Sequence, residues 1–278
     1  MRINPRLIDT LVRHFLNMQA YFTVGILVII VFVIFIKGIS NCNLSFMLTY
    51  PEDMGRHGGV FPAIVGTIFL VALSILFATP LGLGTAIFLT EYTKESRLTT
   101  IIRFGVESLA GIPSIIYGLF GFIFFVIKLE MGWSLLAGAL TMTIMILPTI
   151  IRTSEEAIKA VPKNLRIVSH SLGATKWETT VKVVLPSAAP GILTGIMLSI
   201  GRAVGETAAV IFTMGSSLRL PTSLMESGRT MAVHFYILAR EGISMEKAYA
   251  TALVLVVSIL AINIFAYYMM NKVTAKYS

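Results

Sequence analysis

The sequence predicts an all-α membrane protein with about six transmembrane helices, and two observations support this. Of the 278 residues, 56% are hydrophobic and only 13% are charged, whereas a soluble domain has about a quarter charged residues. The apolar residues also form continuous blocks, and several reach the roughly 20 residues that cross a bilayer. The net charge of +8 is explained by Lys and Arg in cytoplasmic loops, so we expect membrane lipid and no nucleic acid as a partner.

Six spans are expected, and they lie at 20–37, 62–90, 104–127, 133–151, 190–213 and 248–270. The second span is long for one straight crossing and contains Pro80, which predicts a kink or a short extension into the cytoplasm. The third contains Pro113 and should also bend. Lys and Arg are concentrated in the inner segments, which predicts a multi-pass protein of the cytoplasmic membrane with both termini in the cytoplasm.

The spans divide the chain into a cytoplasmic tail at 1–19, a first transmembrane helix with its outer loop at 20–61, a transmembrane core at 62–270 and a cytoplasmic tail at 271–278. The core includes a long cytoplasmic loop at 152–190. The single cysteine, Cys42, and four scattered histidines offer no metal-ligand spacing. The sequence contains no Gly-x-x-x-x-Gly-Lys-Ser/Thr segment that could bind ATP. We therefore expect this chain to be no enzyme and to bind no cofactor itself.

The fifth expected span contains the charged residues Arg202 and Glu206, four positions apart near the middle of an apolar stretch, with the hydroxyl of Thr207 beside them. A charge there costs roughly 2.5–3.5 kcal/mol on insertion scales, so such residues usually pair or face a pathway. One interpretation is a structural ion pair on one helix face. The other is that Arg202 meets a crossing anion, because a guanidinium offers paired donors to phosphate.

The same span has glycines at four-residue spacing, which allow another backbone to approach closely. We expect helix packing at Gly191, Gly195, Gly201 and Gly205.

The cytoplasmic loop has two short segments with helical spacing, separated by Gly173. Glycine there permits a positive φ and a sharp turn. The expected result is a short helix across the cytoplasmic face that presents Leu172, Ala174 and Trp177 to a partner. An ordinary surface helix between two spans is the alternative.

The spacing in this loop resembles the coupling-loop signature of ABC importer permeases, which is Glu-Ala-Ala, three residues, Gly, nine residues and Ile-x-Leu-Pro. Here Gly173 is followed after nine residues by Val183-x-Leu185-Pro186, while Ile167, Val168 and Ser169 stand at the Glu-Ala-Ala positions. The resemblance implies docking into a groove on a cytoplasmic ATPase. The residues it assigns to this coupling are Leu172, Gly173, Ala174, Thr175, Trp177, Leu185 and Pro186.

Further motifs narrow the resemblance. The run Gly-Arg-Ala-Val-Gly-Glu-Thr-Ala at 201–208 is similar to the signature of phosphate-importer permeases, although Ala209 stands where proline commonly follows. Other matches lie at 58–67, 80–82, 90–92, 110–121 and 147–157. Together they resemble the A-type permease subunit of the phosphate-specific ABC importer, with the type I ABC importer permease fold.

This resemblance implies an assembly that imports inorganic phosphate by alternating access. Its expected partners are a related permease in a heterodimer, two ATPase subunits that use ATP and Mg, and an extracytoplasmic phosphate-binding protein. That protein is expected to dock on the outer loop at 214–247. Three alternatives stay open: an ABC permease for another oxyanion such as molybdate or sulfate, a self-sufficient secondary transporter or channel, and a non-transporting scaffold.

Overall fold

The computed structural model describes residues 5–277, and almost all of its regular structure is helical. The first half contains α1 (Pro5–Ile39), α2 (Leu44–Leu48), β1 (Pro51–Glu52), η1 (Asp53–Gly55), β2 (His57–Gly58), α3 (Phe61–Ile87), η2 (Phe88–Tyr92), α4 (Arg97–Ala110), α5 (Ser114–Gly121) and η3 (Phe122–Lys128). The second half contains α6 (Leu135–Ala160), α7 (Lys163–Ser171), α8 (Lys176–Thr179), η4 (Thr180–Val184), α9 (Leu185–Val204), α10 (Ala208–Thr213), α11 (Met231–Arg240) and α12 (Met245–Tyr277).

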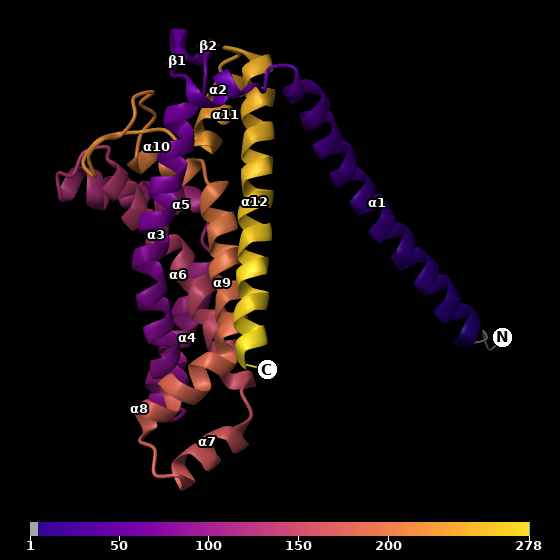
Figure 1. Cartoon of the computed structure of the whole chain (residues 1–278), viewed down its shortest axis with the longest axis vertical. Helices are drawn as coiled ribbons and strands as arrows, with labels where there is room; N and C mark the ends of the chain where they lie inside the picture. Colours follow the sequence, from indigo (N-terminus) through magenta and orange to yellow (C-terminus); the bar gives the residue numbers. More distant parts are fainter. Residues whose placement is uncertain (1–4, 278) are drawn as a thin grey trace.

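Five helical stretches among residues 5–277 are long and apolar enough to cross a membrane, and a sixth span forms if one bent pair counts as one. The long helices α3, α6, α9 and α12 lie side by side in a bundle (Figure 1). Their shared core includes the fully buried side chains of Leu70, Met142, Met145, Ile146 and Ile150. The expected count of about six spans agrees with this architecture.

The second span is longer than a bilayer crossing because α3 continues through Pro80 and is extended by η2, a π-helical turn, to Tyr92. Close packing accompanies the proline. A methyl group added at Gly82 would lie 2.7 Å from the Ile150 side chain of α6. This stretch is therefore helical without interruption from Phe61 to Tyr92, and the extension into the cytoplasm stays a prediction.

The third span is sharply broken. Its two parts, α4 and α5 with η3, meet at an angle of 100°. The break contains Pro113, which lacks an N–H and disfavours helix in the preceding residue. The Tyr117 hydroxyl donates a hydrogen bond across the break to the Leu109 carbonyl, at 2.7 Å. The predicted bend in the third span is confirmed, and it divides the span into two helices.

The fifth span also differs from the expectation. Its apolar helical stretch runs from Lys176 to Val204, and a separate helix, α10, follows after a break at 205–207. The helix ends at Val204, and the Glu206 carboxylate then accepts a hydrogen bond from the Ala209 N–H in the first turn of α10, at 3.2 Å. One continuous helix over 190–213 is therefore wrong.

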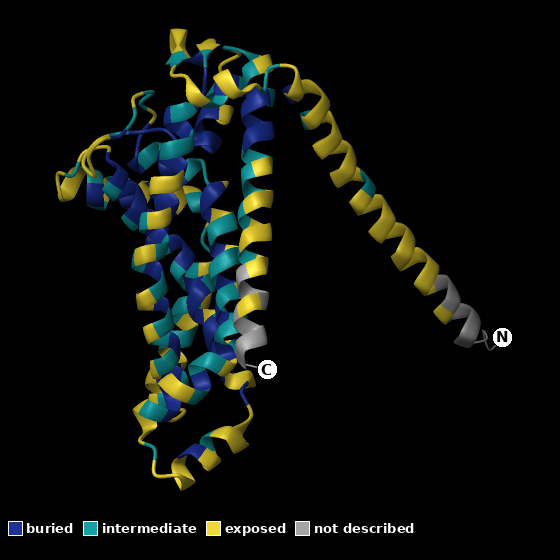
Figure 2. Cartoon of the chain, viewed as in Figure 1, coloured by how far each residue is buried: buried dark blue, intermediate teal, exposed yellow. Residues whose placement is uncertain are grey.

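The first helix diverges from the bundle, and nearly all its described side chains are exposed (Figures 1 and 2). It meets α12 at its carboxyl end, where Gly38 lies against the Tyr249 backbone and the Lys37 ammonium sits 5.0 Å from the Tyr249 ring centroid. Helix α1 already begins at Pro5, inside the segment predicted as a tail, and α12 continues to Tyr277.

Candidate functional site

The Arg202 side chain lies in the last turn of α9, directly before the break at 205–207. It is exposed, and none of the ion pairs within residues 5–277 includes it. It is close enough to Tyr117 of α5 for an electrostatic interaction. Because Tyr117 follows the break in the third span, both broken spans contribute to the neighbourhood of this guanidinium.

The structure does not bring Arg202 and Glu206 together as an ion pair. The expectation that they share one helix face is wrong, because α9 ends at Val204 and Glu206 lies in the break. Glu206 and Thr207 are half-buried, and the Glu206 carboxylate accepts a hydrogen bond from the Ala209 N–H at the start of α10. The cation of Arg202 is thus left without a carboxylate partner among residues 5–277.

Two of the four predicted packing glycines touch another helix of this chain. A methyl group added at Gly191 would lie 2.6 Å from Ala157 of α6, and one at Gly195 would overlap the Thr153 hydroxyl. At Gly201 an added methyl group would meet nothing within 4 Å, and at Gly205 only the Gly201 carbonyl at 3.8 Å. Gly201 and Gly205 are therefore not packing positions within this chain, and their open backbone lies beside Arg202.

Sequence reasoning missed the glycines that bring the two broken spans together. A methyl group added at Gly118 of α5 would lie 2.9 Å from the Ala209 Cα of α10, and one at Gly121 would overlap the Thr141 hydroxyl of α6. These contacts hold the half-helix α5 against α10. The sequence feature that could have predicted this packing is the run 110–121, which contains three glycines.

The loop at 152–190 contains two short helices, α7 and α8, joined by a turn at 172–175. Gly173 has a φ of +83°, as the glycine at this turn predicted. Leu172 is 83% exposed and Trp177 is 62% exposed, so two large apolar side chains are left uncovered at this turn. The Thr175 hydroxyl and the Glu178 carboxylate cap the start of α8 reciprocally.

The other residues assigned to coupling have different surroundings. Ala174 is half-buried, and its carbonyl lies 3.2 Å from the His170 ring. Leu185 and Pro186 begin α9 and are half-buried, with Leu185 packed against an internal apolar cluster. These two residues are therefore not part of the exposed apolar surface, because they form the junction between the loop and the bundle.

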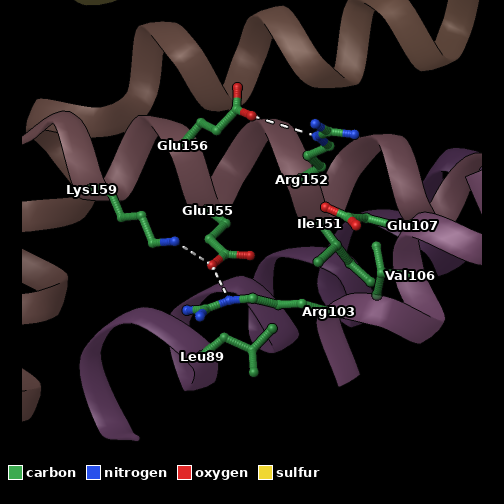
Figure 3. Close-up of a pocket in the computed structure, with 9 residues that line it drawn as sticks. All are labelled: Leu89, Arg103, Val106, Glu107, Ile151, Arg152, Glu155, Glu156 and Lys159. Atoms are coloured by element: carbon green, nitrogen blue, oxygen red, sulfur yellow. Dashed lines mark hydrogen bonds and ion pairs between the residues drawn. The ribbon is translucent and has the colours of Figure 1, made fainter. Parts of the chain in front are cut away.

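A charged pocket of about 150 Å³ lies between η2, α4 and α6 (Figure 3). The Glu155 carboxylate, only 11% exposed, accepts from Arg103 at 2.8 Å and from Lys159 at 2.6 Å. The bond from Arg103 tethers α4 to α6, whereas Lys159 and Glu155 both belong to α6. Three basic side chains and three carboxylates line the pocket, so its charges balance and it offers no net attraction to an anion.

The end of the bundle opposite α7 and α8 (Figure 1) contains a buried Arg–His pair. Arg229 is 6% exposed, and its Nε donates a hydrogen bond to the Ser216 carbonyl at 2.9 Å. Its Nη1 lies 3.2 Å from His234 Nδ1. Burial lowers the pKa of Arg229 to about 10, so it stays charged at neutral pH. Burial and the neighbouring guanidinium lower the pKa of His234 to about 3, so this histidine is a neutral acceptor.

We expect this pair to make the fold acid-sensitive. The unfolded chain binds a proton on His234 below about pH 6.5 while the folded chain does not, so the free energy of unfolding falls as pH drops from there toward 3. Between pH 6.5 and 5 the loss from this group is about 2 kcal/mol. Thermal unfolding of the detergent-solubilised protein measures it. His234→Asn, which keeps an acceptor but cannot titrate, should flatten this dependence, whereas exposed His57→Asn should not.

Residues 78–277 match the family described as binding-protein-dependent transport system inner membrane component. This match covers most of the chain, so the protein belongs to that family. It is an integral membrane protein and a permease component of an ABC transporter system, which also has ATPase and binding-protein partners.

Similar curated proteins have more specific names than the family does. The chain is 36% identical over 219 residues to "Phosphate transport system permease protein PstA 1" of Mycobacterium tuberculosis, covering 78% of this chain and 71% of the relative. It is 34% identical to PstA of Pasteurella multocida over 85% of each chain. It is also 32% identical to the "Probable ABC transporter permease protein YqgI" of Bacillus subtilis over 95% of each chain.

Solved structures agree with the predicted fold. The inward-facing MetNI methionine ABC transporter superimposes with a TM-score of 0.63 at 20% identity, over 75% of this chain and 93% of that chain. A bacterial alginate ABC transporter gives 0.63 at 16% identity, over 94% and 98%. At such identities the likeness concerns the fold alone, and it confirms the type I ABC importer permease fold.

Proposed function

We propose that this chain is a permease subunit of an ATP-driven importer of inorganic phosphate. Relatives named as phosphate permeases match at 34–36% identity over most of the chain. The structural observation that supports this substrate most directly is Arg202, a cation in the last turn of a membrane helix with no acidic partner among residues 5–277. A guanidinium suits a phosphate oxyanion because its planar donors bind two oxygens together.

The proposed path runs along the open face of α9. Gly201 and Gly205 leave the backbone beside Arg202 uncovered, and the breaks in the third and fifth spans expose backbone groups that only a protein-lined or water-filled site tolerates. In this proposal Arg202 attracts the anion, and Glu206 with Thr207 borders the path. Arg202 is the only basic residue well within an expected span, so this chain contributes one cation to the anion, which keeps binding weak enough for release.

The proposed assembly has a related permease facing this surface, which forms a heterodimer. Two cytoplasmic ATPase subunits lie beneath this heterodimer, and one of them docks on the turn at 172–177 of this chain. The ATPases supply energy from ATP and Mg, while this chain itself binds no cofactor. An extracytoplasmic phosphate-binding protein docks on the outer loop at 214–247. Both termini lie in the cytoplasm, with Lys and Arg concentrated on that side.

Reconstitution of the chain with its partner permease, ATPase subunits and binding protein in liposomes tests the proposal. Radiolabelled phosphate should accumulate only with ATP, and excess sulfate or molybdate should leave this uptake unchanged. Displacement by either anion would assign the permease to another oxyanion. Sustained phosphate flux through the purified chain alone, without ATPase, would replace the importer with a self-sufficient transporter or channel.

A further inference from the structure

We call α7, the turn at 172–175 and α8 together the docking loop. Few of its side chains contact the rest of the chain. The apolar residues of α7 face outward, since Ile167 is 62% exposed, Val168 58% and Leu165 41%. Apolar packing inside this chain therefore does little to hold α7. Its inward contacts are polar, and one of them is a hydrogen bond of 2.8 Å between the buried hydroxyls of Ser169 and Thr179.

The Arg166 guanidinium adds further inward contacts of α7, and it uses all three of its nitrogens. Two of them donate to the last carbonyls of α6, Ile158 at 2.9 Å and Val161 at 2.8 Å. Nη2 and Nε also donate to the Glu91 carboxylate, at 2.7 and 3.1 Å. Terminal carbonyls of a helix lack partners within the helix, so this one side chain caps α6 and binds η2 together.

Glu91 belongs to η2, the π-helical extension of the long helix α3. The Arg166 and Glu91 side chains are only 20% and 10% exposed, so solvent screens their pairing weakly. The second helix of the loop reaches the same turn, because the Lys176 ammonium of α8 lies 5.2 Å from the Tyr92 ring centroid. Both helices of the docking loop therefore contact η2 through charged side chains.

From this geometry we infer that the Arg166–Glu91 pair is the joint that transmits displacement of the docking loop to α3. Arg166 and Glu91 are positioning residues. They touch neither ATP nor the transported anion, and this role rests on the proposed function. A force applied to the exposed Leu172 and Trp177 passes through α7 to Arg166, and from there to Glu91 and the second membrane span. The bond to the α6 carbonyls makes α6 move with α3.

Glu91→Gln in the reconstituted complex tests the joint, because glutamine keeps the shape and an acceptor but removes the charge. We expect the ATPase subunits to stay bound and to hydrolyse ATP, while phosphate imported per ATP hydrolysed falls by about tenfold or more, since losing one charge of a buried pair is strongly unfavourable. Arg166→Gln should do the same. The matched control is Glu156→Gln, which removes the exposed partner of Arg152 on the same side of the molecule.

An unchanged import ratio in Glu91→Gln would overturn the joint. So would a parallel loss of bound ATPase, hydrolysis and import, because that result means the pair only maintains the shape of the loop. Absence of phosphate uptake by the wild-type complex is a different result, and it removes the proposed substrate instead.

A distance measurement that needs no phosphate distinguishes the proposed joint from the proposed substrate. In a Cys42→Ser background, spin labels at exposed Ser171 and Leu81 report the distance between the loop and α3. We expect this distance to stay constant on ATP binding in the wild type, because loop and helix move together, and to change in Glu91→Gln. A distance that changes equally in both would refute the joint even if the substrate is not phosphate.

Discussion

Replacing Arg202 with glutamine should reduce ATP-dependent phosphate uptake by about tenfold or more, because a hydrogen bond to a charged group contributes about 1.5–3 kcal/mol. Assembly should be unaffected, since Arg202 makes no ion pair within residues 5–277. Removing an unpaired charge from an apolar region even relieves an insertion cost of roughly 2.5–3.5 kcal/mol. The initial rate of uptake into liposomes, at equal amounts of assembled complex, measures the effect.

Two comparisons sharpen this test. Arg202→Lys keeps the charge but loses the planar pair of donors, so its uptake should lie between wild type and Arg202→Gln. Arg97→Gln makes the same chemical change at an exposed position at the start of α4 and should leave uptake unaltered. Normal uptake by Arg202→Gln would mean that the anion crosses without this guanidinium.

The double change Leu172→Glu and Trp177→Glu should detach the ATPase subunits. Both side chains are large, apolar and exposed on the turn between α7 and α8, and burying one such side chain contributes about 1.5–3 kcal/mol. Losing two, and adding two carboxylates, should weaken association by about a hundredfold or more. Copurification of the ATPase with the tagged permease measures the binding, and uptake should disappear with it.

The control for this surface keeps its apolar character. Leu172→Met with Trp177→Phe preserves most of the contact area and should retain the ATPase. Neither side chain belongs to the buried clusters of the chain, so the glutamate variant should still fold and insert. Retention of the ATPase by a correctly inserted glutamate variant would show that docking occurs elsewhere.

Much of the fold was predictable because the bilayer imposes length and polarity on each span. Span positions followed from apolar blocks, and the bend at Pro113 followed from a residue that cannot continue a regular helix. The size of the bend did not follow, since 100° depends on how α5 packs against α10 through Gly118. The turn at Gly173 was also predictable, because a positive φ there favours glycine.

The candidate site was less predictable. Spacing alone placed Arg202 and Glu206 on one helix face, but the helix ends before Glu206 and separates them. Spacing likewise grouped Leu185 with Leu172, although one packs inward and the other is 83% exposed. A motif fixes the order of residues along the chain, whereas exposure depends on which neighbours cover them.

The sequence by itself determined that this chain crosses a membrane several times, turns sharply at Gly173 and contains a charged residue, Arg202, within an apolar stretch. Local composition and backbone chemistry are sufficient for those properties. Only the tertiary structure decided that Arg202 lacks an acidic partner within the part of the chain that the structure describes, and that Arg166 binds Glu91, 75 positions away. Pairing between distant residues depends on how the helices pack, and no local pattern encodes that distance.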